Sequence, residues 1–138
     1  MRIQIYYGDV PKHFRKTGII KKTVLAALGK LAKKPSELDL VFVTPSEMRA
    51  LNKKFLRHDY VTDVITFPYD EGPVFGDIFV CYQIAKENAR VYKHGAFKEM
   101  LTYAAHGALH LSGMDDKTKK QRAEMDARAE EIITKIYS

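Results

Sequence analysis

The sequence has little of what several protein classes require. It contains one cysteine, Cys81, and no tryptophan among 138 residues. A single thiol forms no disulfide within one chain, which excludes a disulfide-stapled secreted scaffold and favours a reducing compartment. No apolar run approaches the ~18 residues of a membrane-spanning helix, and the N-terminal stretch lacks the apolar core of a secretory signal. We therefore expect a cytoplasmic protein.

Charges of one sign are missing from two parts of the chain. Between positions 59 and 85 there are five acids and no Lys or Arg. Between positions 11 and 34 there is no Asp or Glu, and the eight cations there are Lys12, Arg15, Lys16, Lys21, Lys22, Lys30, Lys33 and Lys34. With a net charge of +6, this separation could create a basic surface suited to a polyanion, beside an acidic zone suited to a cation. A solvated lysine face on one helix is the plainer alternative.

Hydrophobic periodicity predicts strands and helices that alternate along the chain. Strands are expected at 2–7, 38–44, 62–68 and 74–81, where short apolar runs are rich in β-branched residues. Helices are expected at 17–32, from 45, at 82–93 with Gly95 as the stop, from 97 and after 118. Two of these starts, TPSE and TKKQ, have capping-box spacing. The order predicts one α/β (α+β) domain over residues 1–138, with about four strands in a mixed sheet packed by about five helices.

The helix from position 97 is apolar around most of its circumference. Its polar exceptions recur at every fourth position and are Lys98, Thr102, His106 and His110. Residues four apart lie on one helix face, so the two histidines could bind one metal ion. A polar stripe on a buried helix predicts a metal site in a cleft.

The stretch HGALHLSGMDD has the spacing His-x-x-x-His-x-x-Gly-x-x-Asp. Gly113 suits a left-handed turn after the helix, which would bring Asp116 to the ion as a third ligand. Gly107 weakens a helix by roughly 1 kcal/mol relative to alanine; we interpret it as space beside the ion, although it would also admit another segment. Metzincin zinc peptidases share this spacing, but with a general-base glutamate at the position of Gly107 and histidine in place of Asp116. A structural histidine pair, with Asp116 as a turn residue, is the alternative.

Several segments together resemble the YbeY family, whose members are bacterial metal-dependent endoribonucleases linked to ribosomal RNA maturation. HGALHLSGMDD resembles the family signature His-Gly-x-Leu-His-Leu-x-Gly-Tyr-Asp-His. TDVITFP is similar to Thr-Asp-Val-Leu-Ser-Phe-Pro, and FGDIFVC to Leu-Gly-Asp-Ile-x-Ile-Ser. Met125 and the LNKKF segment with Asp59 extend the match from about Leu51 onward. The resemblance implies a Zn²⁺ ion held by His106, His110 and residue 116.

The resemblance also implies a catalytic arginine. The family arginine usually lies three residues before the aspartate matching Asp59, and this chain has Leu56 there. Arg57 is our candidate, with Lys54 in reserve, and Arg57 would contact the scissile phosphate bidentately. We expect the nucleophile to be hydroxide on the metal or the RNA 2′-hydroxyl, with His106 counted among the catalytic residues. Because Asp116 adds a negative charge, the ion should be a weaker Lewis acid, and Mn²⁺ becomes a second candidate.

The resemblance implies a zinc-dependent, single-strand-specific endoribonuclease that acts in rRNA processing and ribosome quality control. Its partners would be ribosomal RNA, with ribosomal subunits or assembly factors as further candidates. Two alternatives stay open: a non-catalytic RNA-binding ribosome assembly factor with a structural metal, and a zinc-dependent peptidase-like metallohydrolase.

Some residues near these motifs have two interpretations each. Thr62 and Asp63 could support the site or merely begin a strand. Bases could stack on Tyr60, Phe67 or Tyr69, although Phe67 also suits the core. We expect Cys81 in the core and His58 and His94 in solvated loops.

Overall fold

Four strands make one mixed sheet in the computed structural model, which describes residues 1–57 and 62–137. The strands are β1 (Arg2–Tyr6), β2 (Glu37–Val43), β3 (Val64–Pro68) and β4 (Val74–Cys81). Their order is β1-β2-β4-β3, with β1, β2 and β4 parallel and β3 antiparallel to β4. The predicted mixed sheet is confirmed.

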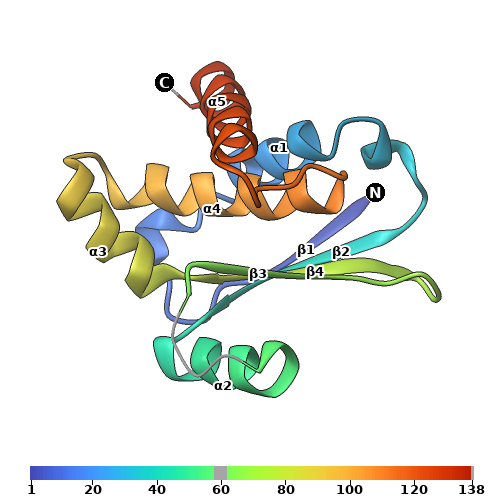
Figure 1. Ribbon diagram of the computed structural model, residues 1–138, viewed down its shortest axis with the longest axis horizontal. Helices are drawn as coiled ribbons and strands as arrows, with labels where there is room; N and C mark the ends of the chain where they lie inside the picture. The colour runs from blue at the N-terminus through green and yellow to red at the C-terminus, as the bar shows by residue number, and fades with distance from the viewer. Residues whose placement is uncertain (58–61, 138) are drawn as a thin grey trace.

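The described part of the chain adds five α-helices. They are α1 (Thr17–Leu28), α2 (Pro45–Leu56), α3 (Tyr82–Tyr92), α4 (Ala96–Leu111) and α5 (Lys119–Ile136), with 3-10 turns at Lys12–Phe14 and Gly29–Lys33. Figure 1 shows α1, α3, α4 and α5 on one side of the sheet and α2 on the other. Among these residues, no helix has the length and apolarity needed to cross a membrane. The predicted α/β architecture is confirmed.

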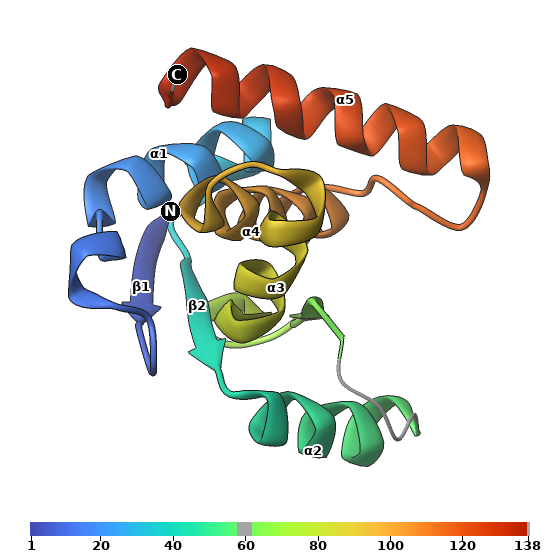
Figure 2. The same ribbon diagram turned by 90° about the vertical axis from the view of Figure 1, so that its left-hand side faces the viewer.

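Helix α4 lies at the centre of this arrangement. It contacts β3 and β4 on one side and α1, α3 and α5 on its others (Figure 2). Its apolar residues, from Phe97 to Leu109, are almost all buried. A helix packed on several sides has a firmly held backbone, so α4 can present its polar stripe from a fixed position.

Local sequence signals explain where two helices begin. Thr44 and Glu47 bond reciprocally, with the Glu47 amide donating to Thr44 Oγ1 and the Thr44 amide to Glu47 Oε1. Thr118 and Gln121 repeat this capping box at the start of α5. Each box satisfies backbone N–H groups that the first turn leaves without partners.

Two predicted helix ends are wrong. The first helix ends at Leu28, and not at position 32, because Gly29 has a φ of 59° and the chain continues as a 3-10 turn. Helix α3 is closed by Lys93, whose φ is 57°, and the His94 amide donates to the Ala89 carbonyl. Gly95 is instead the N-cap residue of α4. In both cases one residue with a positive φ breaks the helical hydrogen-bond pattern.

Candidate metal and catalytic site

The polar stripe of α4 faces helix α5. Lys98, Thr102, His106 and His110 are only partly buried, whereas the residues between them are mostly buried. Lys98 Nζ lies 3.1 Å from Glu130 Oε1, and His106 Nε2 lies 3.1 Å from Asp126 Oδ1. Two residues four apart on α5 therefore pair with two residues of the stripe. Sequence reasoning missed Asp126 and Glu130, although their helical spacing was a signal.

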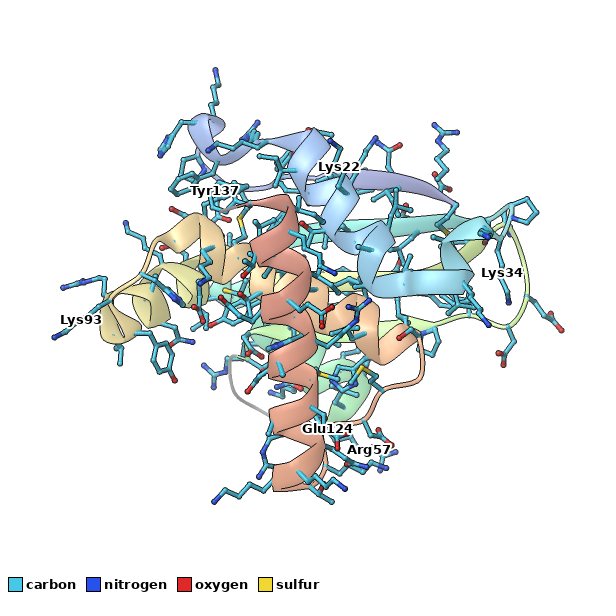
Figure 3. All side chains as sticks on the ribbon, turned by 90° about the horizontal axis from the view of Figure 1, so that it is seen from above. Lys22, Lys34, Arg57, Lys93, Glu124 and Tyr137 are labelled. Atoms are coloured by element: carbon cyan, nitrogen blue, oxygen red, sulfur yellow. The ribbon has the colours of Figure 1, made fainter. Side chains whose placement is uncertain are left out.

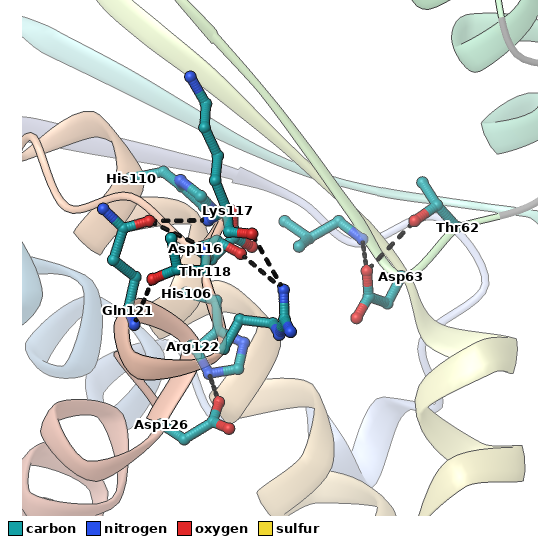
Figure 4. Close-up of polar contacts among 11 residues, drawn as sticks. Thr62, Asp63, His106, His110, Asp116, Lys117, Thr118, Gln121, Arg122 and Asp126 are labelled. Carbon is teal, nitrogen blue, oxygen red and sulfur yellow. Dashed lines mark hydrogen bonds and ion pairs between the residues drawn. The ribbon is translucent and has the colours of Figure 1, made fainter. Parts of the chain in front are cut away.

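The loop after α4 folds back on His110. Gly113 has a φ of 108°, its amide donates to the His110 carbonyl, and the Met114 amide donates to the Leu109 carbonyl. These two bonds form a Schellman motif, which needs a left-handed residue and so favours glycine. The turn places Asp116 Oδ2 3.2 Å from His110 Nε2 (Figure 4). The predicted turn is confirmed; a ligand role for Asp116 stays a prediction.

His106 has a buried nitrogen without a hydrogen-bond partner in the described part of the chain. Its Nε2 lies 3.1 Å from Asp126 Oδ1, but the atoms are not aligned for a hydrogen bond. The short distance therefore does not make a hydrogen bond, because hydrogen bonds weaken steeply as the donor angle departs from linearity. An unpaired buried polar group costs about 1–3 kcal/mol, and coordination of a metal ion would remove that cost.

The donor atoms present suit a divalent metal ion. Imidazole nitrogen and carboxylate oxygen are zinc ligands, and two such atoms on a tetrahedral ion lie about 3.3 Å apart. The 3.2 Å between His110 Nε2 and Asp116 Oδ2 is close to that separation. Within residues 1–57 and 62–137, however, no three His, Cys, Asp or Glu side chains already converge as a metal site. A shared ion would require His106 to turn from Asp126, whose side chain is 70% exposed and free to move.

Gly107 faces the sheet, so the interpretation of this glycine as space beside the ion is wrong. A Cβ atom at this position would lie 2.5 Å from Ile78 Cγ2 and 3.3 Å from methyl groups of Thr66 and Val64. The other interpretation, close approach of a second segment, is confirmed. The glycine therefore positions α4 against β3 and β4, and acts on the histidines only through the helix that carries them.

Replacing Gly107 by alanine should destabilise the fold by about 1–2 kcal/mol. Helix propensity favours alanine by up to ~1 kcal/mol, but overpacking against the fully buried Ile78 typically costs about 1–3 kcal/mol. Denaturant unfolding measures the difference. Gly18→Ala in α1 is the matched control, because a Cβ there meets nothing within 4 Å. If wild type and Gly107→Ala are equally stable, β4 must shift to accommodate the new methyl group without a loss of folding free energy.

A cavity of about 320 Å³ opens beside His106. Residues of α3, α4, α5 and the start of β3 line it, and Asp63, Glu99, Asp126 and Glu130 make it acidic. Asp63 Oδ1 accepts hydrogen bonds from the Val64 amide at 2.8 Å and from Thr62 Oγ1 at 3.3 Å. Asp63 thus fixes the start of β3 and also faces the cavity. Its carboxylate and those around it would attract cations and repel phosphate.

His94 is not a solvated loop histidine, contrary to the sequence prediction. It pairs with the Glu99 carboxylate, which is buried in the first turn of α4. Asn88 Nδ2 donates to the hydroxyl of Tyr103 at 2.5 Å, and burial, with Glu99 nearby, raises the pKa of Tyr103 well above its ordinary value. Tyr103 therefore stays protonated at neutral pH, and these groups form a polar wall of the cavity.

The predicted arginine lies on a different element from the histidines. Arg57 caps α2 with a φ of 59°, and its amide donates to the Asn52 carbonyl. In the part of the chain that the structure describes, no ion pair or hydrogen bond joins its side chain to His106, His110 or Asp116. Lys54 lies over the Phe55 ring at 5.2 Å. A catalytic role for Arg57 stays a prediction.

The remaining predicted residues are mostly structural. Phe67 packs edge-on against Phe55 and Phe79, and Cys81 is fully buried, as expected for core residues. Tyr69 donates to Asp77 Oδ2, which raises its pKa to about 12. His58, Asp59 and Tyr60 lie outside the described residues.

Some cations of the basic stretch at positions 11–34 pack against the fold, and others are exposed. Lys16 Nζ lies over the rings of Phe97 and Tyr137, and Arg15 Nε donates to the Val10 carbonyl. Lys22 and Lys34 are exposed (Figure 3), although Lys34 Nζ also lies over the Phe75 ring at 5.6 Å. Part of this stretch therefore packs against the fold, which neither interpretation included, and only the exposed part could be a solvated or polyanion-binding surface.

Comparison with known proteins decides the family. The family model described as "Endoribonuclease YbeY" matches residues 9–137. The chain belongs to the YbeY family. An endoribonuclease YbeY of Elusimicrobium minutum (strain Pei191) is 56% identical over 143 residues, which cover 99% of this chain and 100% of that protein. The YbeY protein of Chlorobium phaeovibrioides is 35% identical over 83% of this chain and 78% of its own length.

A solved structure confirms the YbeY fold. The solution structure of TM1509 from Thermotoga maritima matches with a TM-score of 0.64 and 30% sequence identity. The match covers 96% of this chain and 91% of that one. The departures from the YbeY signature, Asp116 and Leu56, therefore occur within the ordinary family fold.

Proposed function

We propose that the chain is a metal-dependent endoribonuclease whose ion is held by His106, His110 and Asp116. Membership in the YbeY family supports hydrolysis of RNA. The observation that carries the metal site is the Schellman turn at Gly113, which sets Asp116 Oδ2 3.2 Å from His110 Nε2. The unpartnered Nε2 of His106, one helical turn away, supports a third ligand.

A bound divalent ion would neutralise charge on the phosphate oxygens and lower the pKa of water. The chain's own residues hold the site. Helix α4, packed on several sides, fixes both imidazoles on one face, and Asp126 lies against the His106 ring. Asp116 contributes a negative charge and a hard oxygen donor, so Zn²⁺ is the first candidate and Mn²⁺ the second.

We further propose that the substrate is single-stranded ribosomal RNA, cleaved during rRNA maturation and ribosome quality control in the cytoplasm. The resemblance to the YbeY family supports this choice. The net charge of +6 and exposed cations such as Lys22, Lys30 and Lys33 also suit a polyanion. Ribosomal subunits or assembly factors are the candidate partners.

Substitutions at Asp116 test the ligand set. Purified without chelator, the native protein should contain about one zinc per chain by mass spectrometry. Asp116→Ala should lose most of it, and Asp115→Ala, which removes the neighbouring carboxylate, should keep it. Asp116→His should retain the metal and cleave RNA faster, because a neutral ligand leaves the ion more positive. A metal-free native protein with an intact fold would contradict the site, and slower cleavage by a metal-replete Asp116→His variant would contradict the electrostatic account.

A further inference from the structure

The side chain of Arg122, on the first turns of α5, is tied to the loop that carries Asp116. Its Nη1 donates to the carbonyl of Asp116 at 3.4 Å and to that of Lys117 at 3.3 Å. In Figure 4 the guanidinium extends from this loop toward the side on which Asp63 is drawn. The capping box of Thr118 and Gln121 fixes the helix start from which this side chain extends.

We propose that Arg122 is a catalytic residue that binds the scissile phosphate of RNA at this site. The proposal rests on the proposed endoribonuclease function and adds the cation that a phosphodiester requires there. The carboxylates around His106 and His110 would otherwise repel a phosphate: Asp63, Asp116 and Asp126 are all near them. Arg57, the arginine that the sequence suggested, has no bond to this loop in the described residues.

The guanidinium is presented in a way that suits a phosphate. Both backbone contacts use Nη1, and among the described residues Nε and Nη2 have no hydrogen-bond partner. The N–H groups of those two atoms are parallel and match two oxygens of a phosphate in bidentate geometry. Anchoring through Nη1 would hold this free edge at a constant distance from Asp116.

Helix stability does not explain the charge of this segment. The first turn of α5 contains no acid, while Lys119, Lys120 and Arg122 are exposed cations. The positive end of the helix macrodipole favours acidic residues and disfavours these. A local arrangement that opposes helix stability is expected where function requires it, and an incoming polyanion would relieve the repulsion.

Arg122→Gln tests the proposal, with Arg128→Gln as the matched control that removes one exposed arginine from the same helix. With metal-loaded protein and saturating single-stranded RNA, Arg122→Gln should slow single-turnover cleavage about 10²-fold. Arg122→Lys should recover only part of that loss, because lysine lacks the bidentate edge. Arg128→Gln should stay within about threefold of wild type, a range typical of lost surface pairs. Metal content should be unchanged in all three.

A second measurement does not depend on cleavage. The affinity of chelator-treated protein for the same RNA is measured across salt concentrations. A plot of log affinity against log salt concentration should be less steep in Arg122→Gln, by about 0.7–1. Arg128→Gln should keep the wild-type slope. If the wild type cleaves RNA and Arg122→Gln has both the wild-type cleavage rate and the wild-type salt slope, the proposal is overturned. The endoribonuclease function would still stand. A metal-loaded wild type that cleaves no RNA would overturn both.

Discussion

His110→Ala should lose its metal ion and slow RNA cleavage by at least about 10³-fold. A metal ion contributes several kcal/mol of stabilisation to a phosphoryl transition state, and each 1.36 kcal/mol corresponds to a factor of ten in rate. His110 is central to the site because its Nε2 lies against Asp116 and its carbonyl accepts the Gly113 amide. The substitution removes the imidazole and leaves that backbone bond in place. Metal content and single-turnover cleavage are the two measurements.

The control is His13→Ala, which removes an exposed histidine from the 3-10 turn at Lys12–Phe14. It should retain the metal and the wild-type rate. Normal RNA affinity and normal function in cells after His110→Ala, with the fold intact, would instead favour a non-catalytic assembly factor with a structural metal. Cleavage of a peptide library by the native protein would favour the peptidase-like alternative.

His94→Ala should destabilise the fold by about 2–3 kcal/mol. Glu99 is only 6% exposed, and His94 is the group that pairs with its carboxylate. Removing one hydrogen-bond partner of a buried polar group costs about 1–3 kcal/mol, and more where the group left behind is charged. The His94 side chain is 32% exposed, so water can replace part of the lost contact, and we expect a loss of about 2–3 kcal/mol. Equilibrium unfolding in denaturant at neutral pH measures the loss.

A double substitution separates the buried charge from simple loss of packing. Adding Glu99→Gln to His94→Ala should recover part of the stability, since a neutral amide costs less to bury without a partner than a carboxylate does. Lys98→Ala breaks the more exposed pair with Glu130 and should cost less than about 1 kcal/mol. If His94→Ala costs no more than Lys98→Ala, the buried pair does not contribute to stability.

Features that depend on neighbours in the chain could be predicted from the sequence. The strand β4 was predicted at its observed bounds, Val74–Cys81, because its composition and flanking turn residues are local signals. The capping boxes at Thr44 and Thr118 and the left-handed turn at Gly113 were also predicted. Each is made by hydrogen bonds between residues at most five apart. Such bonds depend mainly on the local sequence, and little on how distant segments pack.

The tertiary structure alone decided which elements cover each face. Helical periodicity placed His106 and His110 on one stripe, but it could not show that Asp126 of α5 would lie against His106. It also could not show that Gly107 would face Ile78 of β4. The same holds for Arg122, whose place beside Asp116 depends on how the loop and α5 pack over α4. The pattern of one helix identifies its faces, whereas the neighbour of each face depends on how all the elements bury their apolar surfaces together.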